Sequence, residues 1–204
     1  MHFMSINQQT GITAQWHELI ADAQSANGIQ LDIPLESYLV HTLIHYTQRP
    51  EIAARIFAID YMLAQHEQGQ LRDTQLRELA DQCLLYAGLF PQYARQRHVR
   101  VSYYVDIGRS AYRDLASGEH AWAEIFVEIS AKFVTLMDTL LAIHQLNESQ
   151  NTSSPATYPL DPLLALQTWQ DTQSQQALKI LQQQTQSSNI VNFRAPQRNK
   201  NTKH

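Results

Sequence analysis

A run of apolar residues with alternating spacings of three and four dominates the middle of this 204-residue chain. The run comprises Phe126, Ile129, Phe133, Leu136, Leu140 and Ile143. This spacing places all six side chains on one stripe of an α-helix, and it is typical of a helix that packs along a partner helix. We therefore predict a long helix from His120 to about Leu146, whose seam belongs either to a helical bundle or to a homodimer.

The same helical periodicity continues on both sides of this segment. Only 6 residues are glycine, β-branched runs are short, and strand-like alternation is essentially absent. The sequence therefore predicts an all-α fold, an irregular bundle of about six to seven helices. The expected helical segments, bounded by glycine, proline and capping residues, are 13–27, 34–46, 51–68, 73–89, a short turn at 92–97, 102–116, 120–146 and 161–184.

Composition divides the chain into a domain and a tail. We expect one helical domain over 1–186, which includes a polar linker at 147–159 and the last helix at 161–184, followed by a disordered basic tail at 187–204. The tail holds four basic residues and no acid, whereas the whole chain has a net charge of −4. The body is therefore acidic, which argues against nucleic-acid binding except through the tail.

Cysteine usage and the N-terminal sequence bear on location. The single cysteine, Cys83, excludes an internal disulfide and fits a reducing compartment. The N-terminus, MHFMSINQQTG, lacks the basic start and apolar run of a signal peptide. No apolar stretch reaches the ~18 to 20 residues that cross a bilayer. We therefore expect a cytoplasmic protein without a membrane partner.

Histidines raise the question of a metal site. His41 and His45 lie four apart on one predicted helix, which is a spacing that metal ligands use. The glutamate of the HExxH motif is missing, however, and the chain contains no Glu-x-x-His of the kind found in di-iron bundles. We therefore assign no metal and no cofactor. A bundle that holds a metal or haem through His41, His45, His17 or His120 is kept as the alternative.

Motifs for nucleophilic catalysis and nucleotide binding are also missing. No GxSxG, P-loop or GxGxxG occurs, so we assign no catalytic residue. Cys83 lies on the apolar stripe of its helix and is predicted to be core. In the helix at 102–116, one face contains Tyr104, Val105, Gly108, Tyr112 and Leu115, and the missing side chain at Gly108 is expected to let another helix approach closely.

A cluster of basic and aromatic residues is the sharpest local feature. Arg95, Arg97, Arg100, Arg109 and Arg113 are five of the fifteen basic residues and lie within nineteen positions. With Tyr103 and Tyr104 nearby, the residues Arg95, Arg97, Arg100, Tyr103, Tyr104 and Arg109 are candidates for binding an anion or an acidic partner. The competing interpretation, which we favour, is structural: Arg109 and Arg113 pair with Asp106 and Asp114, and the other arginines pair with acids on adjacent helices.

The same stretch resembles the core of a known family. Gly88-Leu-Phe-Pro91 is followed by Val101, Tyr103-Tyr104, Gly108 and Ala111-Tyr112. This order is similar to the pattern G-[FL]-F-P, then V-x-Y-Y-x-x-x-G-x-x-A-Y, of a family of small all-helical bacterial proteins whose activity is uncharacterised. The resemblance covers Leu84 to about Leu140 and implies a soluble bacterial protein. It implies no activity, and no catalytic residue is carried over from it.

Together these features favour a non-enzymatic cytoplasmic protein of a bacterium. We expect it to act through contacts with a protein partner, with a second copy of itself or with a small ligand. The alternative is a helical bundle that binds a metal or haem, or an enzyme that uses its core histidines.

Overall fold

The computed structural model describes residues 4–47, 57–118, 122–150 and 160–191. These residues form α1 (Met4–Asn27), α2 (Ile33–Thr47), α3 (Phe57–His66), α4 (Gly69–Gly88), α5 (Gln92–Gln96), α6 (Val101–Ala116), α7 (Ala123–Ala131), α8 (Phe133–Gln150), α9 (Pro162–Thr172) and α10 (Gln175–Val191). No strand occurs among them, so the predicted all-α class is confirmed, with more helices than expected. None of the helices described combines the length and the apolar character that crossing a bilayer requires.

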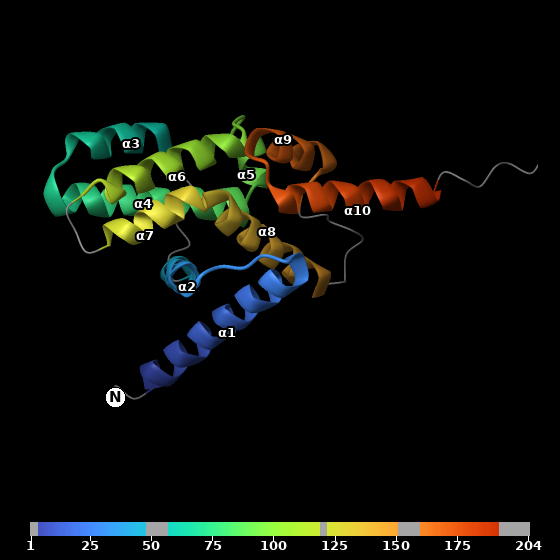
Figure 1. Ribbon diagram of the computed structural model, residues 1–204, viewed down its shortest axis with the longest axis horizontal. Coiled ribbons are helices and arrows are strands. Elements are labelled where there is room, and N and C mark those ends of the chain that lie inside the picture. The colour runs from blue at the N-terminus through green and yellow to red at the C-terminus, as the bar shows by residue number, and fades with distance from the viewer. Residues whose placement is uncertain (1–3, 48–56, 119–121, 151–159, 192–204) are drawn as a thin grey trace, which may run out of the picture.

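The helices form a layered, irregular bundle. α3, α4, α6 and α7 run roughly along the long axis of the molecule, whereas α2 is seen nearly end-on and crosses them (Figure 1). α4 packs most extensively on α6, and α6 in turn packs on α7. α8 contacts both α4 and α1, while α9 and α10 pack on each other. This arrangement brings α2 against α7, two helices that are far apart in the sequence.

Helix α6 supplies the centre of the core. Its buried residues are Val101, Tyr104, Val105, Gly108, Ala111, Tyr112 and Leu115. They recur at spacings of three and four, so the predicted inner face of this helix is confirmed. A Cβ added at Gly108 would lie 2.6 Å from Cε2 of Phe133, at the start of α8. The missing side chain at Gly108 therefore allows the close approach that the sequence predicts.

The heptad pattern crosses from one helix into the next. α7 ends at Ala131 and α8 begins at Phe133, so the single helix predicted at 120–146 is broken at Lys132. All six residues of the pattern are nevertheless buried, because α7 packs on α6 while α8 packs on α4 and α1. The apolar stripe packs against other helices of the same chain. It therefore gives no support to the alternative that it pairs two copies in a homodimer.

The predicted helix at 161–184 is also divided, into α9 and α10. Gln173 has a left-handed backbone conformation, with φ of 61°, and its N–H donates to the carbonyl oxygen of Trp169. The next residue, Ser174, caps the N-terminus of α10: its hydroxyl oxygen accepts a hydrogen bond from the N–H of Ala177 at 3.0 Å. A C-terminal cap and an N-terminal cap therefore stand next to each other in the chain.

Two further predicted boundaries differ from the structure. α8 continues to Gln150, so the predicted linker at 147–159 begins as helix. α10 continues to Val191, inside the predicted tail at 187–204. Polar residues are compatible with an exposed helix, so a polar composition does not by itself end one. The rest of the linker and of the tail lies outside the described residues.

Asp138 of α8 ties the start of α10 to the body of the bundle. Its buried carboxylate accepts hydrogen bonds from the Ser174 hydroxyl at 2.5 Å and from the backbone N–H groups of Gln175 and Gln176 at 2.9 and 3.4 Å. Burial raises the pKa of this carboxyl to about 6, although the hydrogen bonds favour its ionised form. The proton on Asp138 is therefore linked to the stability of the fold.

We expect the stabilising contribution of Asp138 to decrease as the pH rises. Because the folded pKa of about 6 exceeds the ordinary value of 3.8, the folded state binds the proton more tightly than the unfolded chain does. The contribution is fully present below the ordinary pKa and is lost as the pH rises through the folded pKa, a change of roughly 3 kcal/mol at most. Urea unfolding of the wild type and of Asp138→Asn between about pH 4 and 7 measures it. The difference in unfolding free energy between the two proteins should shrink with rising pH, and a difference that grows would contradict the raised pKa.

Candidate functional site

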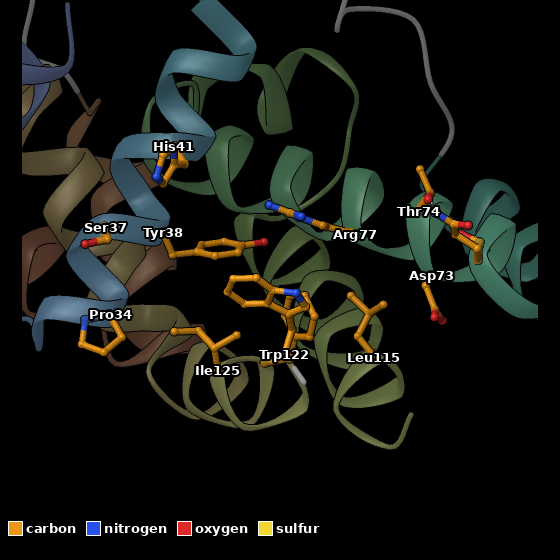
Figure 2. Close-up of a pocket in the computed structure, with 12 residues that line it drawn as sticks. Pro34, Ser37, Tyr38, His41, Asp73, Thr74, Arg77, Leu115, Trp122 and Ile125 are labelled. Atoms are coloured by element: carbon orange, nitrogen blue, oxygen red, sulfur yellow. Dashed lines mark hydrogen bonds between the residues drawn. The ribbon is translucent and has the colours of Figure 1, made fainter. Parts of the chain in front are cut away.

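A cavity of about 700 Å³ opens between α2, α4 and α7. Its lining comprises Pro34, Ser37, Tyr38 and His41 of α2, Gln70, Asp73, Thr74 and Arg77 of α4, Leu115 of α6, and Trp122, Ile125 and Phe126 at the start of α7. Within each of the sets from α2, α4 and α7, the residues recur at spacings of three and four, which places them on one face of their helix. Three helix faces therefore converge on one space (Figure 2).

The two sides of the cavity differ in polarity. Leu115, Trp122 and Ile125 lie on one side, whereas His41 and the guanidinium of Arg77 lie on the other (Figure 2). Trp122 is 71% exposed, so most of its indole is available for contact. Trp122 thereby extends the apolar wall of the cavity to its exposed side.

Asp81 of α4 lies beneath the Tyr38 side of the cavity and is only 5% exposed. Its Oδ1 accepts hydrogen bonds from the hydroxyls of Tyr38 at 2.5 Å and of Tyr112 at 2.6 Å. Its Oδ2 lies 3.8 Å from Nε of Arg77. Because its Oδ1 accepts the Tyr38 hydroxyl, Asp81 fixes the orientation of the Tyr38 ring in the wall of the cavity.

The ionisation states of this network follow from burial. Burial raises the pKa of Asp81, and the hydrogen bonds from Tyr112 and Tyr38 and the charge of Arg77 offset only part of this effect. The pKa values of Tyr38 and Tyr112 lie well above the ordinary value because the phenols are buried and close to the Asp81 carboxylate. Both tyrosines are therefore protonated at neutral pH and donate to Asp81.

The aromatic rings around Asp81 pack on one another. The ring of Tyr112 stacks on that of Phe126, with 5.9 Å between the centroids. Tyr38 meets both rings edge-on, at 6.2 Å from each centroid. These are favourable geometries for aromatic pairs, so the wall formed by Tyr38 and Phe126 is rigid.

The guanidinium of Arg77 lies over the ring of Tyr38, with 5.5 Å between Cζ and the ring centroid, as in a cation–π contact. The side chain is 53% exposed, and among the described residues only Asp81 has a carboxylate within 4.0 Å of it. Figure 2 shows the guanidinium reaching toward the Tyr38 hydroxyl, between His41 and Trp122. A partly neutralised positive charge therefore faces the cavity.

None of the arginines and tyrosines that the sequence singles out lines this cavity. Arg95 forms an ion pair with Asp161 at the start of α9, and Arg100 forms one with Asp171 at 3.2 Å. Both contacts join the region of α5 and α6 to α9. For Arg95 and Arg100, this is the arrangement that the structural interpretation predicts.

The two candidate tyrosines differ in burial. The hydroxyl oxygen of Tyr103 accepts a hydrogen bond from the backbone N–H of Ala58 at 3.0 Å, in the first turn of α3. Tyr104 is fully buried and stacks on Tyr86, with 5.4 Å between the centroids. The two rings meet edge-on, with 5.3 Å between their centroids, but the burial of Tyr104 leaves only Tyr103 within reach of a partner.

The remaining candidate arginines are also separated. Nε of Arg109 donates to the carbonyl oxygen of Ser130 at 3.1 Å, in place of the predicted pair with Asp106. Arg97 is half-buried at the end of α5, and its charge opposes the burial that raises the pKa of Tyr104 to about 12. The predicted cluster is therefore dispersed over several helix contacts, and binding of an acidic partner by these residues stays a prediction.

The candidate histidines do not form a metal centre in the part of the chain that the structure describes. His41 lines the cavity, His45 packs edge-on against the neighbouring tyrosine, and Nδ1 of His17 lies 2.8 Å from Glu36. His120 lies outside the described residues. Elsewhere among the described residues, no three His, Cys, Asp or Glu side chains come together in a group that could hold a metal ion.

Cys83 belongs to the core. Its side chain is fully buried, as predicted, and burial raises the pKa of the thiol well above the ordinary value. The nucleophilic form of cysteine is the thiolate, which such a thiol does not supply at neutral pH. Cys83 is therefore structural.

The two most informative side chains of the cavity, Arg77 and Trp122, do not stand out in the sequence. A signal is present, because the cavity residues of α2 and of α4 share the same spacings of three and four. Polar residues at such spacings are, however, also what a solvated helix face shows. Only the packing of α2 and α7 beside α4 distinguishes a cavity wall from an ordinary surface.

Comparison of the chain with protein-family models, with curated proteins and with solved structures finds no match to it. The resemblance to a bacterial helical family therefore stays a prediction. The functional interpretation rests on the cavity and on the side chains around it.

Proposed function

We propose that this protein is a non-enzymatic binder of a small, largely apolar molecule, which it holds in the cavity between α2, α4 and α7. The cavity itself is the observation that supports the proposal. Its volume is about 700 Å³, which lies within the range of roughly 300–1,000 Å³ that is typical of ligand sites. An apolar wall with a few polar groups is also the usual composition of such sites.

The buried polar groups beside the cavity are suited to orienting a ligand rather than to reacting with it. Asp81 is engaged by Tyr38, Tyr112 and Arg77. A general base must lie within reach of the proton that it abstracts, and Asp81 is buried and is not among the residues that line the cavity. A binding role therefore fits these contacts better than a catalytic role.

The cytoplasm of a bacterium is the location that we propose. Cys83 is a free and buried thiol, which fits a reducing compartment. The bacterial origin is supported by the family resemblance of the segment from Leu84 to about Leu140.

We expect N-phenyl-1-naphthylamine, a neutral aromatic probe that fluoresces in apolar surroundings, to bind the protein saturably with one molecule per chain. The variant Thr74→Trp projects an indole into the cavity and should weaken binding by about tenfold or more, which corresponds to about 1.4 kcal/mol. Fluorescence titration measures both affinities.

Thr185→Trp is the matched control. Thr74 and Thr185 are both exposed, and both donate a hydrogen bond of 2.8 Å from the hydroxyl to the carbonyl four residues earlier. Thr185 lies on α10 and does not line the cavity, so its substitution should leave the affinity unchanged. Equal weakening by the two variants, or no saturable binding to the wild type, would count against the proposed function.

A further inference from the structure

The charged side chains around the cavity differ in how well they are paired with an opposite charge. Besides Tyr38, the titratable side chains among its lining residues are Asp73, His41 and Arg77. The carboxylate of Asp73 lies 3.7 Å from the guanidinium of its neighbour Arg72. The ion pair of Arg77 is the weaker of the two, because its partner Asp81 also accepts hydrogen bonds from two tyrosines.

Arg77 retains hydrogen-bonding capacity. A guanidinium has five N–H donors in a planar fork, and Asp81 faces it through Nε at 3.8 Å, which is longer than a hydrogen bond. Oδ1 of Asp81 already accepts from Tyr38 and Tyr112. The contact with Asp81 and a hydrogen bond with Tyr38 use only part of this fork, so the half-exposed side chain keeps donors for a planar anion.

A cationic ligand fits the cavity poorly. The guanidinium of Arg77 already lies over the face of Tyr38 and would repel a second cation placed beside it. The remaining acid of the lining, Asp73, is already paired with Arg72. Arginines of the protein itself therefore already occupy the Tyr38 face and the Asp73 carboxylate.

The wall of the cavity opposite Arg77 indicates the chemical character of the rest of the ligand. Leu115, Trp122, Ile125 and Phe126 contribute an apolar surface with two aromatic rings. From these contacts, and resting on the proposed function, we infer that the ligand is a carboxylic acid with an aromatic or other apolar body. Its carboxylate is bound by the guanidinium of Arg77, and its body lies against Trp122.

A pair of probes that differ only in charge tests this inference. 1-Naphthaleneacetate and 1-naphthaleneacetamide have the same ring and nearly the same size. Calorimetric titration of the full chain at neutral pH should show the acid binding about tenfold or more tightly than the amide, because hydrogen bonds to a charged group are the stronger ones. Arg77→Met should reduce the affinity for the acid to that for the amide and leave the amide affinity unchanged.

Arg95→Met is the control, because Arg95 is exposed and pairs with Asp161 away from the cavity lining. It should alter neither affinity. If Arg77→Met fails to fold by circular dichroism, Arg77→Lys serves instead, since lysine keeps the charge and loses the planar fork. The preference for the acid should then shrink but not vanish.

The outcomes separate the two proposals. Equal binding of acid and amide by the wild type, or equal weakening of both by the substitution at Arg77, would overturn the inference and leave the proposed function standing. Failure of both compounds and of the neutral naphthylamine probe to bind would overturn the proposed function, and the inference with it.

Discussion

Replacement of Gly88 by alanine is expected to lower the free energy of unfolding by about 3 kcal/mol. A Cβ at this position would lie 2.5 Å from Cβ of Leu140 and 2.9 Å from the carbonyl oxygen of Met137, both on α8. A backbone oxygen does not move without its helix, so α4 and α8 would have to separate along their contact. Urea or thermal unfolding measures the loss.

Gly11→Ala is the control for this prediction. Gly11 also lies within a helix, α1, but no atom lies within 4 Å of the Cβ that alanine would add. Alanine has the higher helix propensity, so this variant should be more stable than the wild type by up to about 1 kcal/mol. The same substitution therefore has opposite signs at the two positions, and a similar effect at both would contradict the close contact at Gly88.

Asp81→Ala is expected to cost about 3 kcal/mol of unfolding free energy. The hydroxyls of Tyr38 and Tyr112 both lose their acceptor, and Tyr112 is fully buried, so no solvent replaces it. Arg77 loses its partner as well. Urea unfolding measures the loss, and the exposed Asp106→Ala, on the same helix as Tyr112, should change stability by less than about 0.5 kcal/mol.

A double variant tests the reason for that loss. Much of the cost in Asp81→Ala should come from the phenol of Tyr112 that is left buried without an acceptor. Tyr112→Phe removes this hydroxyl, so the double variant Asp81→Ala/Tyr112→Phe should be more stable than Asp81→Ala by about 1 kcal/mol or more. If the second substitution adds further loss instead, the hydrogen bond to Asp81 is not the main contribution of Tyr112.

The fold class and the core faces can be predicted from sequence, whereas the helix ends are harder to predict. The stripe of α6 is confirmed because burial of one helix face dictates its apolar spacing. No glycine or proline lies at the helix breaks at Lys132 and Gln173, so the sequence has no local signal that predicts them. The second break is stabilised by Asp138, 36 residues from Ser174 in the sequence, and a contact at that separation leaves no local pattern.

The candidate site is less predictable than the fold. Arg77 and Asp81 read in the sequence as an ordinary pair four residues apart on a helix. Their role depends on Tyr38 from α2 and on Tyr112 from α6, which only tertiary packing brings together.

The arginine and tyrosine cluster is far more visible in the sequence, because its residues are close together along the chain. Closeness along a helical chain does not make side chains converge, since neighbouring positions point in different directions. Arg95 and Arg100 accordingly contact α9, while Tyr103 contacts α3.

The cap that Asp138 provides makes the last two helices dependent on those that precede them. Asp138 of α8 accepts hydrogen bonds from the first turn of α10, so a peptide of residues 160–191 alone retains the caps at Gln173 and Ser174 but lacks this carboxylate. The start of α10 therefore has its full set of hydrogen bonds only where α8 lies beside it.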